Sequence, residues 1–220
     1  MSKPGWLLGE QPDLLGDRLA EMRAEIQKAD PDRLAARTGT VYQAQAEGQG
    51  RFQLAWWGRT IEIDFPAFTA RDVESGAALH TFELTMLAYY FDLSDGTPMR
   101  GEWLAFNQLP DGMFYAQAFQ GYTGNELLKA FSNDADAFLE ANQVLGGRRE
   151  FFGNLAFSYQ VLPRVRIMVV CWLGDDDFPA SYRILFDAAA SHHLTTDGCA
   201  ILGSQLARRL IKNKPAGMSA

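Results

Sequence analysis

Residues 165–187 read VRIMVVCWLGDDDFPASYRILFD, and this segment indicates the fold more directly than any other. Two apolar runs, Val165 to Trp172 and Ser181 to Phe186, flank a loop that holds three aspartates, a glycine and a proline. This composition is typical of two strands joined by a loop. The first run is almost entirely apolar, as in a strand that is covered on both faces. We therefore predict an antiparallel hairpin with the densest charge cluster of the chain at its mouth.

Helical periodicity appears on the N-terminal side of this hairpin. Residues 11–28 carry apolar side chains near helical spacing. Asp30 can cap a second helix over residues 31–37, which starts with a proline and ends at Gly39. Residues 77–93 predict the strongest helix, with apolar side chains around most of its circumference. A helix of this kind is expected at the centre of the fold.

Alternation of apolar and polar residues predicts strands between these helices. Residues 60–65 alternate clearly, residues 51–57 moderately well, and residues 41–46 only weakly. Gly58-Arg59 is the expected turn between the two better strands. These segments therefore form a hairpin of their own.

The rest of the chain predicts one short strand and three helices. The strand covers residues 101–106, and helices are expected over residues 126–131 and 135–145. Thr195-Thr196-Asp197 can cap a final helix that runs to about Ile211.

Paired strands of this kind favour an α+β fold over a doubly wound sheet. We predict one α+β domain, in which an antiparallel sheet packs against the central apolar helix and the C-terminal helix. The expected divisions are a helical N-terminal arm (residues 1–38), the α+β domain (39–211) and a flexible tail (212–220).

Composition and charge exclude several classes of protein. The formal net charge is −7 over 220 residues, and basic residues cluster only as doublets, so we expect no binding to nucleic acid. No run of about 18 apolar residues predicts a membrane span, and the N-terminus lacks the core of a signal peptide. The two cysteines lie in apolar stretches, which is typical of reduced, buried thiols in a cytoplasmic protein.

Three acids in the hairpin loop are candidate metal ligands. Asp175, Asp176 and Asp177 offer the oxygen ligands that Ca²⁺ or Mg²⁺ prefers. Their spacing does not match an EF-hand loop. The alternative, which we favour, is a solvated acidic loop that keeps an apolar hairpin soluble.

A second candidate group follows the hairpin. One of the adjacent residues His192 and His193 could pair with Asp187 to hold a metal or a tetrapyrrole, or to act as a general base. The alternative is one exposed histidine and one that satisfies backbone groups. Trp172, with other tryptophans, could line a pocket for a planar ligand, although core packing is the commoner role of such residues.

From about Ala77 to Ile211 the sequence resembles the bacterial and archaeal family called domain of unknown function 3786. The residues that carry the resemblance are Gly101–Phe106, Leu145-Gly146-Gly147, Cys171–Pro179, Ile184–Asp187, His192-His193-Leu194 and Asp197. The resemblance implies no assigned activity. It implies relatives in anaerobic microbes, some of them joined to a cysteine-rich iron–sulfur segment related to that of corrinoid iron–sulfur proteins. The first 76 residues of this chain contain no cysteine.

Together these features predict a cytosolic accessory or binding protein with a small-molecule or protein partner. It would hold a cofactor or metal near the acidic loop, and the resemblance adds a link to corrinoid or one-carbon metabolism. One alternative is a metal-dependent enzyme that uses Asp177 or Asp187 with His192. Another is a protein-interaction module that docks a partner through its N-terminal helices. The sequence leaves the cofactor and the oligomeric state open.

Overall fold

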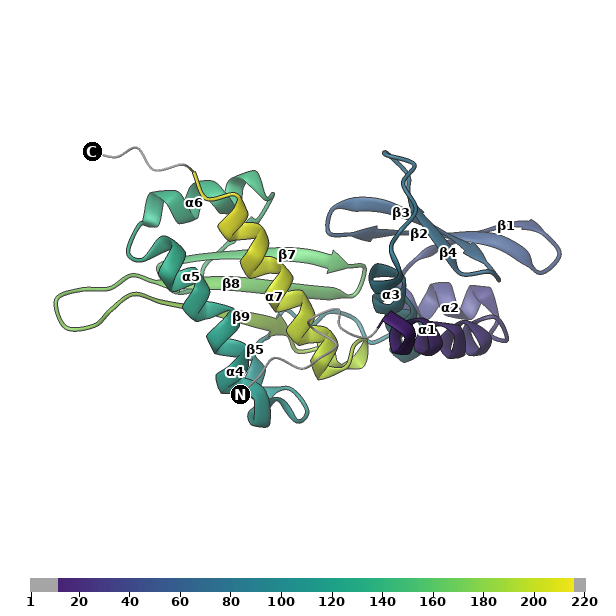
Figure 1. Ribbon diagram of the computed structural model, residues 1–220, viewed down its shortest axis with the longest axis horizontal. Helices are drawn as coiled ribbons and strands as arrows, with labels where there is room; N and C mark the ends of the chain where they lie inside the picture. The colour runs from purple at the N-terminus through teal and green to yellow at the C-terminus, as the bar shows by residue number, and fades with distance from the viewer. Residues whose placement is uncertain (1–11, 216–220) are drawn as a thin grey trace. The chain divides into compact units, whose positions relative to one another are not determined.

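The computed structural model describes residues 12–215, which divide into two compact units (Figure 1). The first unit contains the described residues up to Met99, together with Gln160–Val165 and Ala189–Thr195. The second contains Arg100–Tyr159, Arg166–Ala188 and the described residues from Thr196 onward. None of the helices within residues 12–215 combines the length and the apolar character that a membrane crossing requires.

The first unit combines helices with a four-stranded antiparallel sheet. Its helices are α1 (Pro12–Ile26), α2 (Pro31–Thr38) and α3 (Thr81–Leu93), with a 3₁₀ turn, η3 (Ala190–His192). Its strands, in sheet order, are β1 (Val41–Ala46), β2 (Gln49–Trp56), β3 (Arg59–Phe65) and β4 (Thr69–Asp72). The predicted N-terminal helices and the three predicted strand segments are all present.

The capping residues of α2 were correctly predicted. The Asp30 carboxylate accepts a hydrogen bond of 2.8 Å from the Arg33 N–H, and Pro31 occupies the first helical position. Gly39 ends the helix with a φ of 66°, a left-handed conformation that favours glycine.

The β2–β3 hairpin buries the predicted face. Phe52 pairs with Ile63 and Leu54 pairs with Ile61, and all four side chains are buried. The turn lies at Trp57-Gly58, one residue before the predicted position, because Trp56 pairs with Arg59. Both turn residues have positive φ, 53° and 77°, as the tight hairpin turn that matches strand twist requires.

Helix α3 packs on this sheet through aromatic rings. The Phe91 ring lies 5.0 Å from Phe52 and 5.3 Å from Phe68, both edge to face. The helix begins at Thr81, later than predicted. The residues before it, Ala77–Leu79, are held by β4 instead: Asp72 N–H donates to the Ala77 carbonyl, and Leu79 N–H donates to the Ala70 carbonyl.

The second unit holds a five-stranded antiparallel sheet, except for Gln160–Leu162 at the end of one strand and Val165 at the start of the next, which belong to the first unit. Its strands, in sheet order, are β5 (Trp103–Ala105), β9 (Ser181–Asp187), β8 (Val165–Trp172), β7 (Leu155–Leu162) and β6 (Arg148–Glu150). Its helices are η2 (Phe106–Gln108), α4 (Gly112–Tyr122), α5 (Gly124–Phe131), α6 (Ala135–Val144) and α7 (Thr196–Lys212). The β8–β9 pairing, from Ile167–Phe186 to Trp172–Ser181, confirms the predicted hairpin.

The helices of this unit pack on one face of the sheet (Figure 1). Phe119 of α4 stacks on Phe106 at 4.1 Å and lies 5.9 Å from Phe186 of β9. A Cβ at Gly203 of α7 would meet Phe119 at 2.6 Å, so this glycine lets the helix approach closely. On the other face a small buried cluster is rimmed by half-buried tryptophans; it comprises Ala156, Met168, Val170 and Leu185, with Trp103, Ala105 and Trp172 packed against it.

The α+β class is confirmed, and the strands divide between two sheets where one was expected. Helix α4 and strands β4, β6 and β7 were not predicted. Three bulky residues of α4, Met113, Phe114 and Tyr115, are exposed, so its pattern gives no apolar stripe. The division into an arm, a domain and a tail stays a prediction.

Candidate functional site

Four aromatic side chains, three of them exposed and one half-buried, lie at the same end of the five-stranded sheet. Phe151 and Phe152 lie between β6 and β7, Trp172 ends β8, and Phe178 lies on the loop between β8 and β9. Phe151 is fully exposed and Phe178 is 71% exposed. The Phe152 ring meets Trp172 edge to face at 6.1 Å. We call these four side chains the aromatic end.

Hydrogen bonds join the β6–β7 connection to the end of β8. Asn154 N–H donates to the Cys171 carbonyl at 3.1 Å, and its side-chain oxygen accepts from Leu173 N–H at 2.9 Å. Gly153 has a φ of 57°, and a Cβ there would lie 2.7 Å from Val170. Glycine is therefore required for this close approach. The connection is held firmly while its two phenylalanines point outward.

The β8–β9 loop is fixed in the same way from the helical side. Asn133, between α5 and α6, donates to the Gly174 carbonyl at 3.2 Å. Its side-chain oxygen accepts from Gly174 N–H at 2.7 Å. A paired contact of this kind holds the start of the loop in one position.

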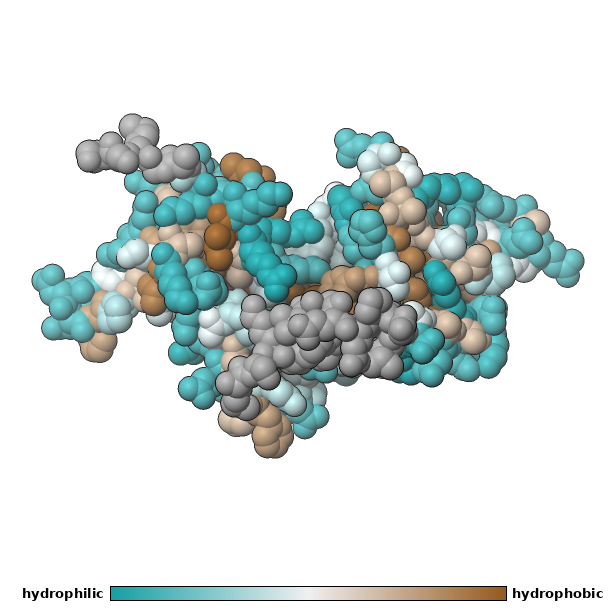
Figure 2. All heavy atoms as spheres, in the orientation of Figure 1, coloured by the Kyte–Doolittle hydropathy of each residue, from teal (hydrophilic) through white to brown (hydrophobic). Residues whose placement is uncertain are grey.

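The three predicted acids form the tip of this loop, and all three are exposed. The Asp175 carboxylate accepts from the N–H groups of Asp177 (3.0 Å) and Phe178 (2.9 Å), and the Asp175 N–H donates to the Phe178 carbonyl. Asp175 thus closes the loop locally and sets the position of Phe178. The hydrophilic surface of the loop is visible at the left edge of Figure 2. We call Asp175–Asp177 the acidic loop.

Metal-ligating side chains do not converge in the part of the chain that the structure describes. No three His, Cys, Asp or Glu side chains there lie close enough together to hold a metal ion. The acidic loop places three exposed carboxylates next to Phe178.

Asp187 is fully buried at the end of β9. Its carboxylate accepts hydrogen bonds from the main-chain N–H groups of Arg100 (2.9 Å) and Gly101 (2.8 Å). Arg166 Nη2 lies 3.5 Å from the same carboxylate, and the guanidinium lies over the Trp103 ring. A buried carboxylate is tolerated because such donors replace water. Asp187 thus anchors the segment that leads into β5.

The carboxylate that faces His192 is Asp95. His192 Nδ1 lies 2.7 Å from Asp95 Oδ2 and 3.3 Å from the Thr97 hydroxyl. Hydrogen bonds from Thr97, followed by the contact with His192, lower the pKa of Asp95. Both partners of His192 belong to the turn after α3. A pairing of either histidine with Asp187 stays a prediction.

His193 is fully buried and uses both ring nitrogens. Nε2 lies 2.9 Å from the Thr97 carbonyl, which can only accept, so Nε2 carries the proton. Nδ1 therefore accepts from the Ser94 hydroxyl at 3.1 Å. Burial lowers the pKa of His193 and favours this neutral form. His192 is thus half-buried beside Asp95, and His193 is buried with a hydrogen bond to a main-chain carbonyl.

The lowered pKa of His193 predicts acid sensitivity. The folded form resists protonation, whereas the unfolded chain takes up a proton near pH 6.5. The stabilising contribution is fully present above that value and is lost as the pH falls toward the folded pKa. We expect the free energy of unfolding to fall by up to about 1.4 kcal/mol per pH unit in this window. Urea titrations across the window measure this slope. His193→Gln should flatten it, while His80→Gln, at an exposed position, should leave it unchanged.

Neither cysteine is a candidate nucleophile. Cys171 and Cys199 are buried and free, as predicted. Burial raises the pKa of both thiols, that of Cys199 to about 12. Thiols of this kind stay protonated and unreactive near neutral pH.

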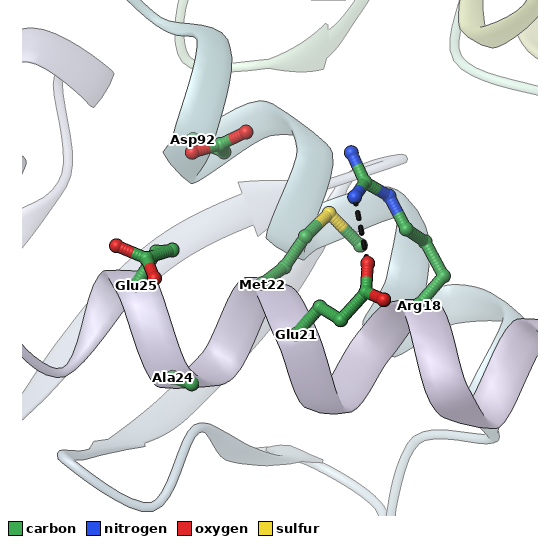
Figure 3. Close-up of a pocket in the computed structure, with 6 residues that line it drawn as sticks. All are labelled: Arg18, Glu21, Met22, Ala24, Glu25 and Asp92. Carbon is green, nitrogen blue, oxygen red and sulfur yellow. Dashed lines mark hydrogen bonds and ion pairs between the residues drawn. The ribbon is translucent and has the colours of Figure 1, made fainter.

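A shallow pocket lies between α1 and α3 (Figure 3). It is lined by Arg18, Glu21, Met22, Ala24, Glu25 and Asp92. Arg18 is already engaged, since its guanidinium pairs with Glu21 at 2.9 Å and bonds the Tyr89 hydroxyl at 3.3 Å. Glu25 pairs with Lys28. These charges form ordinary surface pairs along the helices, so we place no site here.

The sequence singled out Trp172 as a candidate cofactor contact and Asp175–Asp177 as candidate metal ligands, and it did not point to Phe151, Phe152 or Phe178. A signal for Phe151 and Phe152 was present, because this pair sits between the polar run Gly147–Glu150 and Gly153-Asn154. Two adjacent phenylalanines in a connection of that composition cannot both enter a core.

Comparison with known proteins gave one match. A family model described as "Domain of unknown function (DUF3786)" matches residues 30–209. No curated protein and no solved structure matches the chain.

Proposed function

The chain belongs to the DUF3786 family, and we propose that it is a binding or accessory protein that docks a partner protein through the aromatic end. The observation that carries this proposal is that one end of the five-stranded sheet carries Phe151, Phe152 and Phe178, all exposed, together with the half-buried Trp172 that Phe152 contacts. Aromatic side chains dominate the affinity of protein interfaces.

The negative charge beside the aromatic end indicates what kind of partner surface would fit there. The three aspartates of the acidic loop are exposed next to Phe178, and the chain has a net charge of −7. A complementary surface would offer an apolar recess for the rings and a rim of Lys or Arg. Charges at such a rim mainly accelerate encounter and reject wrong partners, while the rings supply affinity.

Rigidity of both loops supports docking without folding on binding. Asn154 fixes the β6–β7 connection, and Asn133 fixes the β8–β9 loop. Loop backbones that are held before contact lose less conformational entropy when a partner binds.

A matched pair of variants tests the docking surface. Phe151→Ser with Phe178→Ser removes two exposed rings, and exposed positions of this kind cost little stability. The control is Met113→Ser with Phe114→Ser, which removes similar exposed apolar surface from α4. Tagged proteins are incubated with extract of the source cells, and bound proteins are quantified by mass spectrometry. We expect a partner whose recovery drops at least about tenfold with the first variant and is unchanged with the control.

Salt and charge variants refine the test. Asp176→Asn with Asp177→Asn should slow association with that partner and weaken its dependence on salt. If the wild type and the Phe151/Phe178 variant recover the same proteins in equal amounts, the aromatic end is not the docking surface and the proposal is wrong.

A further inference from the structure

Three of the four sheet edges in the described structure are protected against pairing with another chain. An exposed edge offers unpaired N–H and C=O groups, and proteins blunt it with short or charged strands or cover it. Strands β5 and β6 have only three residues each, and β6 reads Arg-Arg-Glu. The outer edge of β4 is covered, because residues 77–79 hydrogen-bond along it.

Strand β1 is neither short, charged nor covered by hydrogen-bonded residues within the described chain, and its one irregularity is a register shift at Gln45. It reads VYQAQA and contains no charge, no proline and no glycine. Five of its six residues are exposed, and within residues 12–215 it pairs with β2 alone. A register shift at Gln45 leaves Val41–Ala44 as the regular stretch.

We propose that β1 pairs antiparallel with β1 of a second copy of this chain, which gives a two-fold dimer with a continuous eight-stranded sheet. In a two-fold interface the same residues of the two copies face one another. A charged side chain on the strand would therefore face the same charge on the other copy and be repelled. β1 carries none. Its glutamines can pair reciprocally, because each amide both donates and accepts. The uncharged edge is therefore complementary to itself.

Strand geometry limits the pairing register. The two-fold axis stands perpendicular to the shared sheet, so outward side chains face outward side chains. Gln43 pairs with Arg51 of β2, whose neighbour Phe52 points into the core, so Gln43 points outward. In either register that pairs the regular stretch with itself, the two Gln43 side chains lie within roughly 8 Å of each other.

Two properties of the dimer follow. Four regular residues on each strand give a small interface, so association is weak and depends on concentration. Each copy carries a net charge of −7, so the two copies repel each other. Added salt screens that repulsion and strengthens the dimer, the opposite of its effect on a contact driven by opposite charges.

Sedimentation velocity with charged variants tests the inference. The wild type should sediment as a monomer of 24.5 kDa when dilute and approach twice that mass at high concentration. Gln43→Lys alone and Gln43→Glu alone should stay monomeric, because each places like charges across the axis. An equal mixture of the two should recover the dimer, since opposite charges then meet. Ala55→Lys adds the same charge at an exposed position of β2, away from the edge, and should dimerise as the wild type does.

Rescue by mixing is specific to self-pairing. A wild type that remains monomeric at about 1 mM would overturn the proposal. So would Gln43→Lys and Gln43→Glu variants that each dimerise as strongly as the wild type. Because β1 and the aromatic end lie in different units, this outcome is independent of the docking test above.

Discussion

Replacement of Asp187 by alanine is expected to lower the free energy of unfolding by about 3–5 kcal/mol. The carboxylate is fully buried and receives two main-chain N–H groups, from Arg100 and Gly101. It also lies 3.5 Å from the mostly buried Arg166 guanidinium. Alanine would leave two donors and a cation without their acceptor. Leaving one buried charge unpaired lowers the free energy of unfolding by far more than the intact pair raises it.

Two further variants separate charge from packing. Asp187→Asn keeps the volume and one acceptor oxygen, so it should cost less than alanine. Asp187→Ala with Arg166→Met removes both charges, and the double variant should be more stable than Asp187→Ala alone. Urea unfolding followed by circular dichroism measures all three. If Asp187→Ala costs less than about 1 kcal/mol, the described contacts do not carry the stability assigned to them.

Asp187 also shows what local sequence patterns can and cannot predict. Its position at the end of a strand was predictable, because the strand Ser181–Asp187 has a clear apolar pattern. Its partners were not, because Arg100 and Gly101 lie 87 and 86 residues away in the sequence. The histidines follow the same rule, since His192 meets Asp95 across 97 residues. Contacts over such separations depend on topology, which residue spacing does not encode.

Elements with strong periodicity or clear caps were predictable, and those without were not. Helix α2 has both an aspartate cap and a terminal glycine, and it was found with nearly correct bounds. Helix α4 has neither a side-chain cap bond nor an apolar stripe, and it was missed. The aromatic end was half predictable for a related reason. Trp172 and the acidic loop follow a strong strand, whereas Phe151 and Phe152 look like core residues until the turn that exposes them is known.

Phe91→Ala should destabilise the first unit by about 3–5 kcal/mol. Phe91 is fully buried on α3, and its ring meets Phe52 of β2 and Phe68 edge to face. Truncation to alanine removes these contacts and leaves a cavity between the helix and the sheet. Rigid strands on one side and a long apolar helix on the other allow little collapse into that space, so the cost should lie in the upper part of the range.

Hydrogen exchange measured by mass spectrometry should locate this loss in α3, β2 and β3, because these elements share the aromatic contacts. Phe91→Leu retains most of the apolar volume and should cost clearly less than alanine. Leu93→Ala truncates a side chain on the same helix that is 40% exposed, so it should cost less than about 1 kcal/mol. Equal losses from Phe91→Ala and Leu93→Ala would mean that the aromatic contacts of α3 do not hold the helix on the sheet. Since α3 is also the helix whose apolar circumference predicted a central position, that result would remove the physical basis of the prediction as well.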